Sequence, residues 1–517
     1  MKKFINLKKI FYIEFISIII LGALTSLSLP PYNFLFINFI TLSLFFIFIF
    51  FKKKNYDNNK KFLYGWLFGL GYFSTNLYWI TISLTFDENT KYLIPFALIL
   101  IPVSLAIFYG LATYFFFTIN VKKPTSNLFL FSLLIGVVEF LRGNIFTGFP
   151  WNLIAYSLSD NLEIIQVVSL LGTYAFNMLC VLFFASPAIL FIRENRKEIF
   201  ICVFCLILPI IFYITGSSKI KLFQSLNLVQ NDHIIRALGS NIDLERFYGS
   251  ADTALVINEL IDLSEPTLNK KIFFVWPEGI IPNINQLELK EYESLFEDKF
   301  NENHILGIGI NSLEQDKGKN KYYNSFSFYD HEINLVTAYN KVNLVPFGEF
   351  LPFEKILSRI GLTSITNNYQ SYSSGKNREI INIKEQNFDL KILPLICYEI
   401  IYSGRISNNY KFDYIINISE DGWFGESIGP YQHFTHSIFR AIESGKYLIR
   451  SANNGIAAIV NPTGFIENKI PFRSSGYIDF SEKRIVKTTL FSQHGNKMFL
   501  IIILLYIFLI FSFNRIS

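Results

Sequence analysis

Eight long apolar runs constrain this sequence more than any other feature. A helix needs about 20 mostly apolar residues to cross the hydrocarbon core of a bilayer. Candidate runs lie at 10–29, 34–51, 62–84, 92–120, 128–141, 164–192, 199–216 and 498–513. With 51% hydrophobic and 17% charged residues, the chain is also too apolar for an ordinary soluble protein. The sequence therefore predicts an α-helical membrane bundle of eight transmembrane helices.

The segment 217–497 has a different character. It contains all six histidines and short strand-like runs separated by turns, at an ordinary charge density. We therefore expect three parts: a seven-helix bundle in 1–216, a folded aqueous domain in 217–497, and a last transmembrane helix in 498–517.

Basic residues cluster in alternate connections between the apolar runs. Positive residues in short loops stay on the cytoplasmic side, so both termini are predicted to be cytoplasmic and the 217–497 domain to lie outside. The residues are Lys2, Lys3, Lys8, Lys9, Lys52, Lys53, Lys54, Lys60, Lys61, Lys122, Lys123, Arg193, Arg196, Lys197 and Arg515. Without them, the chain has fewer basic residues than its 41 acidic ones, which argues against nucleic-acid binding.

Two of the apolar runs allow other interpretations. The first begins with lysines before its apolar stretch, as a cleaved signal peptide also does. The fifth leads into "FLRGNIFTGFPWNLIAYS", residues 140–157, where Gly, Pro and aromatic residues suggest re-entrant or interfacial backbone. Such backbone is tolerated at membrane depth only where protein or water covers it.

Cys397 in "PLICYEI", residues 394–400, is the one cysteine of the aqueous domain. The other three, Cys180, Cys202 and Cys205, lie in apolar runs far upstream. Outside the cytoplasm a thiol normally pairs, and Cys397 has no partner within its domain. One interpretation is an inert packing residue, which is a common fate of buried cysteine. The other is a nucleophile.

Two further stretches favour the nucleophile. "IFFVWPEGIIP", residues 272–282, is a strand-like run that ends at Glu278, where a sheet can present a general base. "YNKVNLVPFGEFLP", residues 339–352, carries Lys341 and Glu349 around an apolar turn. An ammonium near a thiol favours the thiolate and can stabilise an oxyanion. Base, cation and thiol together predict nucleophilic catalysis.

In their order and spacing, "WPEG", "YNKVNLVPFGEF" and "CYEI" resemble the Glu, Lys, Cys triad of the nitrilase (carbon-nitrogen hydrolase) superfamily. Together with "FLRGNIFTGFPWN" and the stretch 421–464, which begins "DGWFGESIGPYQHF", they make nearly the whole chain resemble the apolipoprotein N-acyltransferase family. The resemblance implies that the aqueous domain is an α/β nitrilase-like αββα sandwich.

The same resemblance implies a function. A fatty acyl chain would pass from a phospholipid donor to the α-amino group of the diacylglyceryl-cysteine of an apolipoprotein acceptor, through a thioester on Cys397 in a ping-pong reaction. Glu278 would be the base and Lys341 the oxyanion stabiliser. Supporting or substrate-binding roles fall on Glu349, Tyr398, Glu399 and Trp423. The implied location is the bacterial inner (cytoplasmic) membrane, multi-pass, with the catalytic domain in the periplasm. No cofactor or metal is implied, and a monomer is expected.

The sequence departs from the family pattern at two places. The family usually has a tryptophan early in the domain, whereas this chain has none between Trp151 and Trp276, and Phe247 or Tyr248 takes that place. The stretch 419–422 reads Ser, Glu, Asp, Gly, where the family more often has Asn, Asp and Ala. We expect Asp421 to be structural.

Other hypotheses remain open at this stage. His433 and His436 are spaced for one helix face, but zinc needs at least three protein ligands and no suitable third one follows. A membrane-anchored amidase or nitrilase acting on small amides, and a non-catalytic lipid-binding protein, are the rival functions. The stretch 353–365, "FEKILSRIGLTSI", is either an arm that dips into the membrane interface or an ordinary surface helix.

Overall fold

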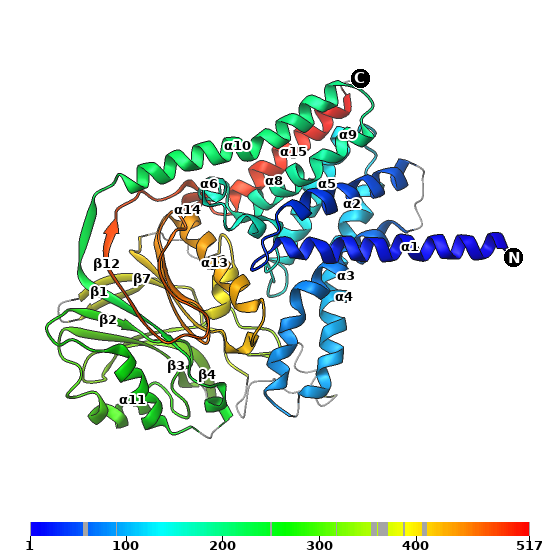
Figure 1. Ribbon diagram of the computed structural model, residues 1–517. Helices are drawn as coiled ribbons and strands as arrows, with labels where there is room; N and C mark the ends of the chain where they lie inside the picture. Colours follow the sequence, from blue (N-terminus) through cyan, green and yellow to red (C-terminus); the bar gives the residue numbers. More distant parts are fainter. Residues whose placement is uncertain are drawn as a thin grey trace. The chain divides into compact units, whose positions relative to one another are not determined.

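The computed structural model describes residues 2–54, 60–88, 90–248, 251–316, 318–352, 359, 371–385, 388–405 and 411–515. The stretch 353–365, except Arg359, therefore lies outside the described residues. The chain divides into two compact units. The first comprises Met1–Lys221 with Gln493–Ser517, and the second comprises Leu222–Ser492 (Figure 1).

The first unit is helical. Its longer helices are α1 (Lys2–Thr25), α2 (Phe36–Lys54), α3 (Lys61–Leu77), α4 (Ile94–Thr118), α5 (Pro124–Arg142), α8 (Thr173–Ala185), α10 (Lys197–Gln224) and α15 (Lys497–Arg515). Its shorter ones are η1 (Ser26–Ser28), η3 (Tyr78–Thr85), η4 (Lys91–Leu93), η5 (Ile154–Leu158), α6 (Leu162–Ile165), α7 (Val168–Leu171), η6 (Ser186–Ala188) and α9 (Ile189–Ile192). Among the described residues, six stretches are long and apolar enough to cross a membrane. The membrane-bundle class is confirmed, while the count of eight stays a prediction.

Two of the expected spans are not single α-helices. The run 164–192 is broken at Gly172, whose φ of +79° lies outside the right-handed helical region, so α6 and α7 precede α8 as separate short helices. In the run 62–84, the α-helix ends at Leu77 and a 3₁₀ segment, η3, follows. Hydrophobicity alone predicted where these runs lie but not where their backbone bends.

Close packing of helices in the first unit relies on glycine and aromatic side chains. A Cβ on Gly22 of α1 would lie 2.0 Å from the carbonyl oxygen of Phe68 in α3, so only glycine allows this approach. Helix α15 packs on α5 through ring contacts, with Phe499 stacked on Phe140 at a centroid distance of 4.6 Å. The last helix of the chain is thus an integral part of the first unit.

The second unit is built on a 12-stranded sheet with the order β5-β4-β3-β2-β1-β9-β8-β7-β6, in which β12 pairs with β1, β10 with β9, and β11 with β10. The strands are β1 (Leu228–Ser240), β2 (Ile272–Val275), β3 (His304–Asp316), β4 (Lys319–Tyr329), β5 (Leu335–Asn340), β6 (Ile381–Glu385), β7 (Phe388–Ile396), β8 (Tyr414–Glu420), β9 (Tyr447–Asn453), β10 (Ala457–Val460), β11 (Ile466–Ile470) and β12 (Gly476–Arg484). Its helical segments are η7 (Leu244–Tyr248), α11 (Thr253–Ser264), η8 (Glu288–Leu295), η10 (Cys397–Ile401), η11 (Gly422–Phe424), α13 (Gly429–Ser444) and α14 (Leu490–His494).

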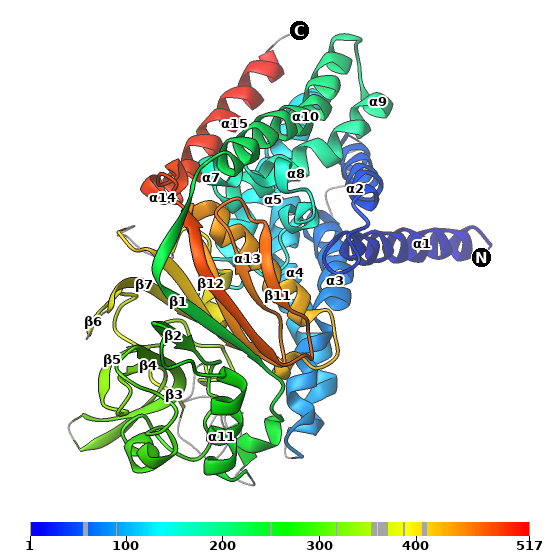
Figure 2. The same cartoon turned by 60° about the vertical axis from the view of Figure 1, so that its left-hand side comes forward.

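The sheet consists of two halves joined by a narrow seam. Strands β1 to β5 with β12 form one half, and β6 to β11 form the other. The seam is the parallel pairing of β1 with β9, limited to Gly239 with Ala452 and Ser240 with Asn453. Figure 2 shows β12 running beside β1, with which it pairs antiparallel. Together with the helices of the unit, this arrangement fits the expected α/β nitrilase-like class.

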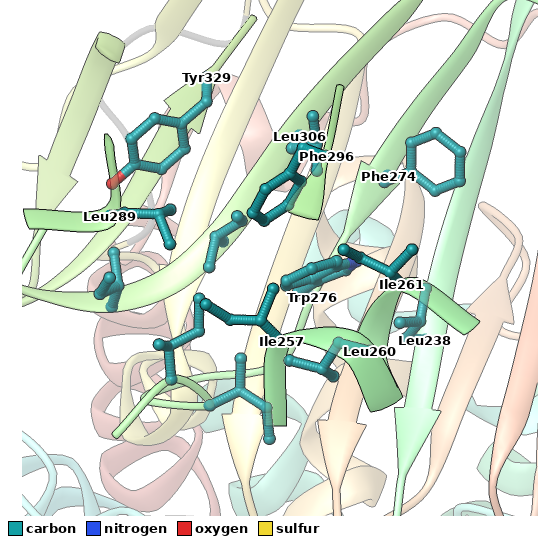
Figure 3. Close-up of a cluster of buried hydrophobic side chains, with 14 of the residues drawn as sticks. Leu238, Ile257, Leu260, Ile261, Phe274, Trp276, Leu289, Phe296, Leu306 and Tyr329 are labelled. Carbon is teal, nitrogen blue, oxygen red and sulfur yellow. The ribbon is translucent and has the colours of Figure 1, made fainter. Parts of the chain in front are cut away.

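Helix α11 covers the first half of the sheet. Asp252 caps it by accepting a hydrogen bond from the Ala254 N–H at 2.8 Å, and its apolar residues recur every three or four positions and are buried. Ile257 and Leu260 face Trp276 in this core (Figure 3). Burial of each such side chain contributes about 1.5–3 kcal/mol. The Trp276 indole also donates to the Ser264 hydroxyl at 2.9 Å. Apolar packing and this hydrogen bond therefore both hold Trp276, two residues before Glu278.

Candidate active site

Cys397 follows the last residue of β7 and opens the 3₁₀ segment η10. Its φ is +47°, in the left-handed region that residues other than glycine seldom adopt. Such conformations persist only where the surroundings enforce them, and they cluster at functional sites. The cysteine lies at the edge of the sheet and is only 7% exposed, so its thiol has little access to water.

Glu278 and Lys341 form a buried ion pair at the ends of β2 and β5. The Lys341 ammonium donates to Glu278 Oε1 at 3.0 Å and to Glu349 Oε1 at 2.9 Å. The backbone N–H of Glu420, at the end of β8, donates to Glu278 Oε2 at 2.9 Å. Three of the residues expected from the sequence, Glu278, Lys341 and Glu349, therefore lie in contact with one another.

Asn324 also belongs to this cluster, although the sequence gave no sign of it. Its side-chain amide donates to Glu278 Oε1 at 2.7 Å and to Glu349 Oε1 at 2.8 Å, so it bridges the two carboxylates from the middle of β4. Asn324 lies within a strand rather than at its end, and no recognisable motif surrounds it. Only the antiparallel pairing of β4 with β3 and β5 brings it to the site.

The charges around Cys397 set the state of its thiol. Burial and the Glu278 carboxylate raise the pKa of Cys397 well above its usual value, and the nearby Lys341 only partly opposes them. Burial disfavours the ammonium of Lys341, but Glu278 and Glu349 outweigh it and raise the pKa of that group well above its usual value. The resting site therefore holds a protonated thiol beside a fixed cation, rather than the preformed thiolate that a lysine alone would favour.

Glu399 connects the loop that follows Lys341 to the turn that contains Cys397. It is fully buried and accepts hydrogen bonds from the backbone N–H groups of Val342 and Ile396, both at 2.9 Å. Arg378 forms an ion pair with it at 3.3 Å. One carboxylate thus holds the residue after Lys341 and the residue before Cys397.

Tyr398 and Trp423, the other expected residues, pack against different aromatic side chains. Tyr398 directly follows the cysteine, is buried, and packs edge-on against Tyr402 with centroids 5.5 Å apart. Trp423 is half-buried in η11 and stacks on Phe247 at 5.3 Å. The ring of Phe247, a candidate for the place of the missing early tryptophan, lies 3.4 Å from where a Cβ on Gly279 would be, next to Glu278.

Behind the cysteine lies a buried polar network. Asp421 is ion-paired with Arg450 at 2.8 Å and contacts His433 Nδ1 at 2.9 Å. His433 Nε2 is 3.2 Å from the carbonyl oxygen of Cys397. Burial, only partly offset by Asp421, lowers the pKa of His433, whose ring lies between the Asp421 carboxylate and that carbonyl. His433 therefore supports the backbone of the cysteine turn, and Asp421 has the structural contacts expected of it.

This geometry provides a thiol, a carboxylate that can take its proton, and a cation beside both. Such a set can form and break an acyl-thiol bond, because the base generates the nucleophile and the cation offsets the negative charge of the tetrahedral intermediate. No group of three or more His, Cys, Asp or Glu side chains suited to a metal ion occurs among the described residues.

Comparison with known proteins agrees with the two-unit architecture. Residues 21–186 match the apolipoprotein N-acyltransferase N-terminal domain, and residues 263–479 match the carbon-nitrogen hydrolase family. Among solved structures, Nit3 of Saccharomyces cerevisiae, a member of the nitrilase superfamily, is similar at 15% identity and a TM-score of 0.33, covering 48% of this chain and 90% of that one. An amidase from Nesterenkonia sp. AN1 is similar at 12% identity and a TM-score of 0.33, covering 49% of this chain and 91% of that one.

Curated relatives match almost from end to end. The apolipoprotein N-acyltransferase of Rhodopseudomonas palustris is 30% identical over 489 residues, covering 92% of this chain and 90% of that protein. The apolipoprotein N-acyltransferase of Rhizobium rhizogenes is 31% identical over 487 residues, covering 89% of this chain and 88% of that protein. Both the membrane bundle and the hydrolase-like unit are shared, and the chain belongs to the apolipoprotein N-acyltransferase family.

Proposed function

We propose that this protein is a membrane acyltransferase of lipoprotein maturation, which moves a fatty acyl chain from a phospholipid to the α-amino group of an apolipoprotein's N-terminal diacylglyceryl-cysteine. Family membership supports the general activity. The observation that carries the mechanism is the contact of Lys341 with Glu278, two groups whose charges also shift the pKa of the Cys397 thiol.

The first half-reaction forms the acyl-enzyme. Glu278 accepts the thiol proton as Cys397 Sγ attacks the ester carbonyl, and the new C–S bond leaves a tetrahedral oxyanion. Lys341 has three N–H bonds, of which its two carboxylate contacts account for two, and it stabilises the oxyanion together with a backbone N–H near Tyr398. The C–O bond then breaks, and the proton held by Glu278 passes to the departing lysophospholipid alcohol.

The second half-reaction regenerates the thiol. The lipoprotein α-amine attacks the thioester, the C–N bond forms and the C–S bond breaks. Glu278 mediates transfer of the amine proton to the sulfur. A thioester suits this step because it reacts readily with amines, and the buried position of Cys397 limits competing hydrolysis.

The charge pattern of the sequence supports the orientation, and the family resemblance supports the location. Under this proposal the second unit faces the periplasm of a bacterium, the protein lies in the inner membrane, and it acts as a monomer. The acyl donor then comes from the outer leaflet of that membrane.

The decisive experiment uses the purified full chain with phospholipid and no lipoprotein. Intact-mass analysis should show one acyl adduct on the Cys397 peptide together with released lysophospholipid, and neutral hydroxylamine should remove the adduct. Addition of a lipoprotein acceptor should discharge it. If Cys397→Ala releases lysophospholipid at the wild-type rate, the thiol is a packing residue and the proposed mechanism fails.

A further inference from the structure

One buried ion pair links the two regions in which this sequence departs from its family pattern. Glu420 lies in the stretch 419–422, and Phe247 stands near the place of the missing tryptophan. Arg246, the residue before Phe247, is ion-paired with the Glu420 carboxylate, and both side chains are 1% exposed. Nothing in the mechanism above uses this pair.

Glu420 contacts the base through its backbone while its side chain binds elsewhere. Its N–H donates to Glu278 Oε2 at 2.9 Å. Its carboxylate accepts from Arg246, from the Asn453 amide at 2.7 Å and from the Gly422 N–H at 2.9 Å. The same residue therefore connects the base to η7, to the end of β9 and to the turn that carries Trp423.

Arg246 fixes the other side of this connection. Its guanidinium donates to the carbonyl oxygen of Asp243 at 2.9 Å and lies 4.3 Å from the centroid of the Phe247 ring. That ring stacks on Trp423 at 5.3 Å, and its Cζ lies 3.4 Å from where a Cβ on Gly279 would be. The two aromatic rings are thereby held at a set position beside the turn of Glu278.

We infer that Arg246 and Glu420 are positioning residues for the reaction with the acyl donor, which they serve by locking the Phe247 and Trp423 rings against the Glu278 turn. The inference rests on the proposed function. A long-chain donor must lie against the side chains around the base, so its reaction depends on where these rings are held. A small electrophile needs only the Cys397 thiol.

The pair is suited to a clean test because both partners can be neutralised together. Removing one partner leaves a buried charge without its counter-ion, which is strongly destabilising, whereas removing both is often nearly neutral. Arg246→Met and Glu420→Gln should each lower the thermal unfolding temperature, and the double variant should recover most of that loss. The control is Arg236→Met with Asp479→Asn, which removes a different ion pair, at 2.7 Å, between β1 and β12.

The readout compares two reagents on the full chain in detergent. With phosphatidylethanolamine in mixed micelles, acylation of Cys397 in the double variant should be slower than in the wild type by about tenfold or more. Alkylation of Cys397 by iodoacetamide should stay close to the wild-type rate, and the control variant should match the wild type in both reactions.

Each outcome decides one question. Wild-type acylation in the double variant would show that the pair serves folding alone, and equal loss of acylation and alkylation would show a general distortion of the cysteine turn; either result overturns the inference. If the wild-type protein itself forms no acyl adduct, the proposed function fails, and this inference fails with it.

Discussion

The Glu399 carboxylate accepts a hydrogen bond from the backbone N–H of Val342 at 2.9 Å, although the two residues are 57 positions apart in sequence. Val342 follows Lys341, and Glu399 lies two residues after Cys397. The cation and the nucleophile are therefore held in register by a single buried side chain. These contacts give the carboxylate of "CYEI" a structural task.

Replacement of Glu399 by Gln should loosen both loops. Gln keeps one acceptor oxygen but presents an NH₂ group where the carboxylate accepts from Ile396 N–H, and it removes the partner of Arg378. We expect a loss of stability of about 3 kcal/mol or more, together with slower acylation of Cys397. Thermal unfolding and acyl-adduct formation measure the two effects. Glu302→Gln, at an exposed position, is the control and should change neither.

The state of the Cys397 thiol gives a pH prediction. Burial and Glu278 raise its pKa, so alkylation by iodoacetamide should be slow at neutral pH and should accelerate as the pH rises. Glu278→Gln removes the negative charge and should lower the thiol pKa. This variant should be alkylated faster than the wild type at a given pH while losing acylation. A pH-independent alkylation rate in the wild type would instead indicate a preformed thiolate.

Asp421 gives a prediction about stability. Burial opposes its charge, but Arg450 and His433 outweigh it and hold the pKa of Asp421 well below its usual range. A carboxyl with a depressed folded-state pKa stabilises the fold above its unfolded pKa of about 4, and this stabilisation is lost as the pH falls toward the folded value. Asp421→Asn should therefore cost about 3–5 kcal/mol near pH 7.

The difference between wild type and Asp421→Asn should shrink below about pH 4, because protonation of the Asp421 carboxyl in the unfolded chain then favours unfolding of the wild type. Thermal unfolding at several pH values tests this, with exposed Asp389→Asn as the control. A difference that stays constant down to the lowest pH would show that the Asp421 charge does not stabilise the fold.

Membrane orientation is tested by labelling. Cysteine introduced at Lys91 should react with a membrane-impermeant maleimide added outside the cell, whereas cysteine at Lys122 should not, because positive loops stay in the cytoplasm. Both lysines are exposed, so burial does not distinguish them, and the described native cysteines are buried. The reverse pattern would place the second unit in the cytoplasm.

Much of the candidate site could be predicted because strand ends are visible in sequence. Lys341 and Cys397 directly follow strands, Glu278 lies three residues past the end of β2, and strands of one sheet bring such ends to a common edge. Asn324 could not be found in this way, since a polar residue within β4 gives no local signal and reaches the site only through strand pairing. The Arg246–Glu420 pair depends likewise on contacts between segments 174 residues apart.

The fold likewise has features that the sequence predicts and features that it does not. Hydrophobicity located the membrane helices because the bilayer demands a minimum apolar length. It did not show that Gly172 breaks the run 164–192, because the hydrophobicity of an apolar run does not depend on whether its backbone is straight or bent. The state of the thiol was also beyond the sequence, since it reflects burial and the distance to Glu278 rather than the presence of Lys341.

The position of α15 in the first unit has a consequence for how the protein is made. Its ring contacts with α5 join the last helix of the chain to one that is synthesised more than 350 residues earlier. The ribosome completes the whole of Leu222–Ser492 before α15 emerges. Domains generally fold as units during synthesis, N-terminal parts first. The second unit can therefore fold while the first unit still lacks α15, which reaches α5 only after Leu222–Ser492 has been synthesised.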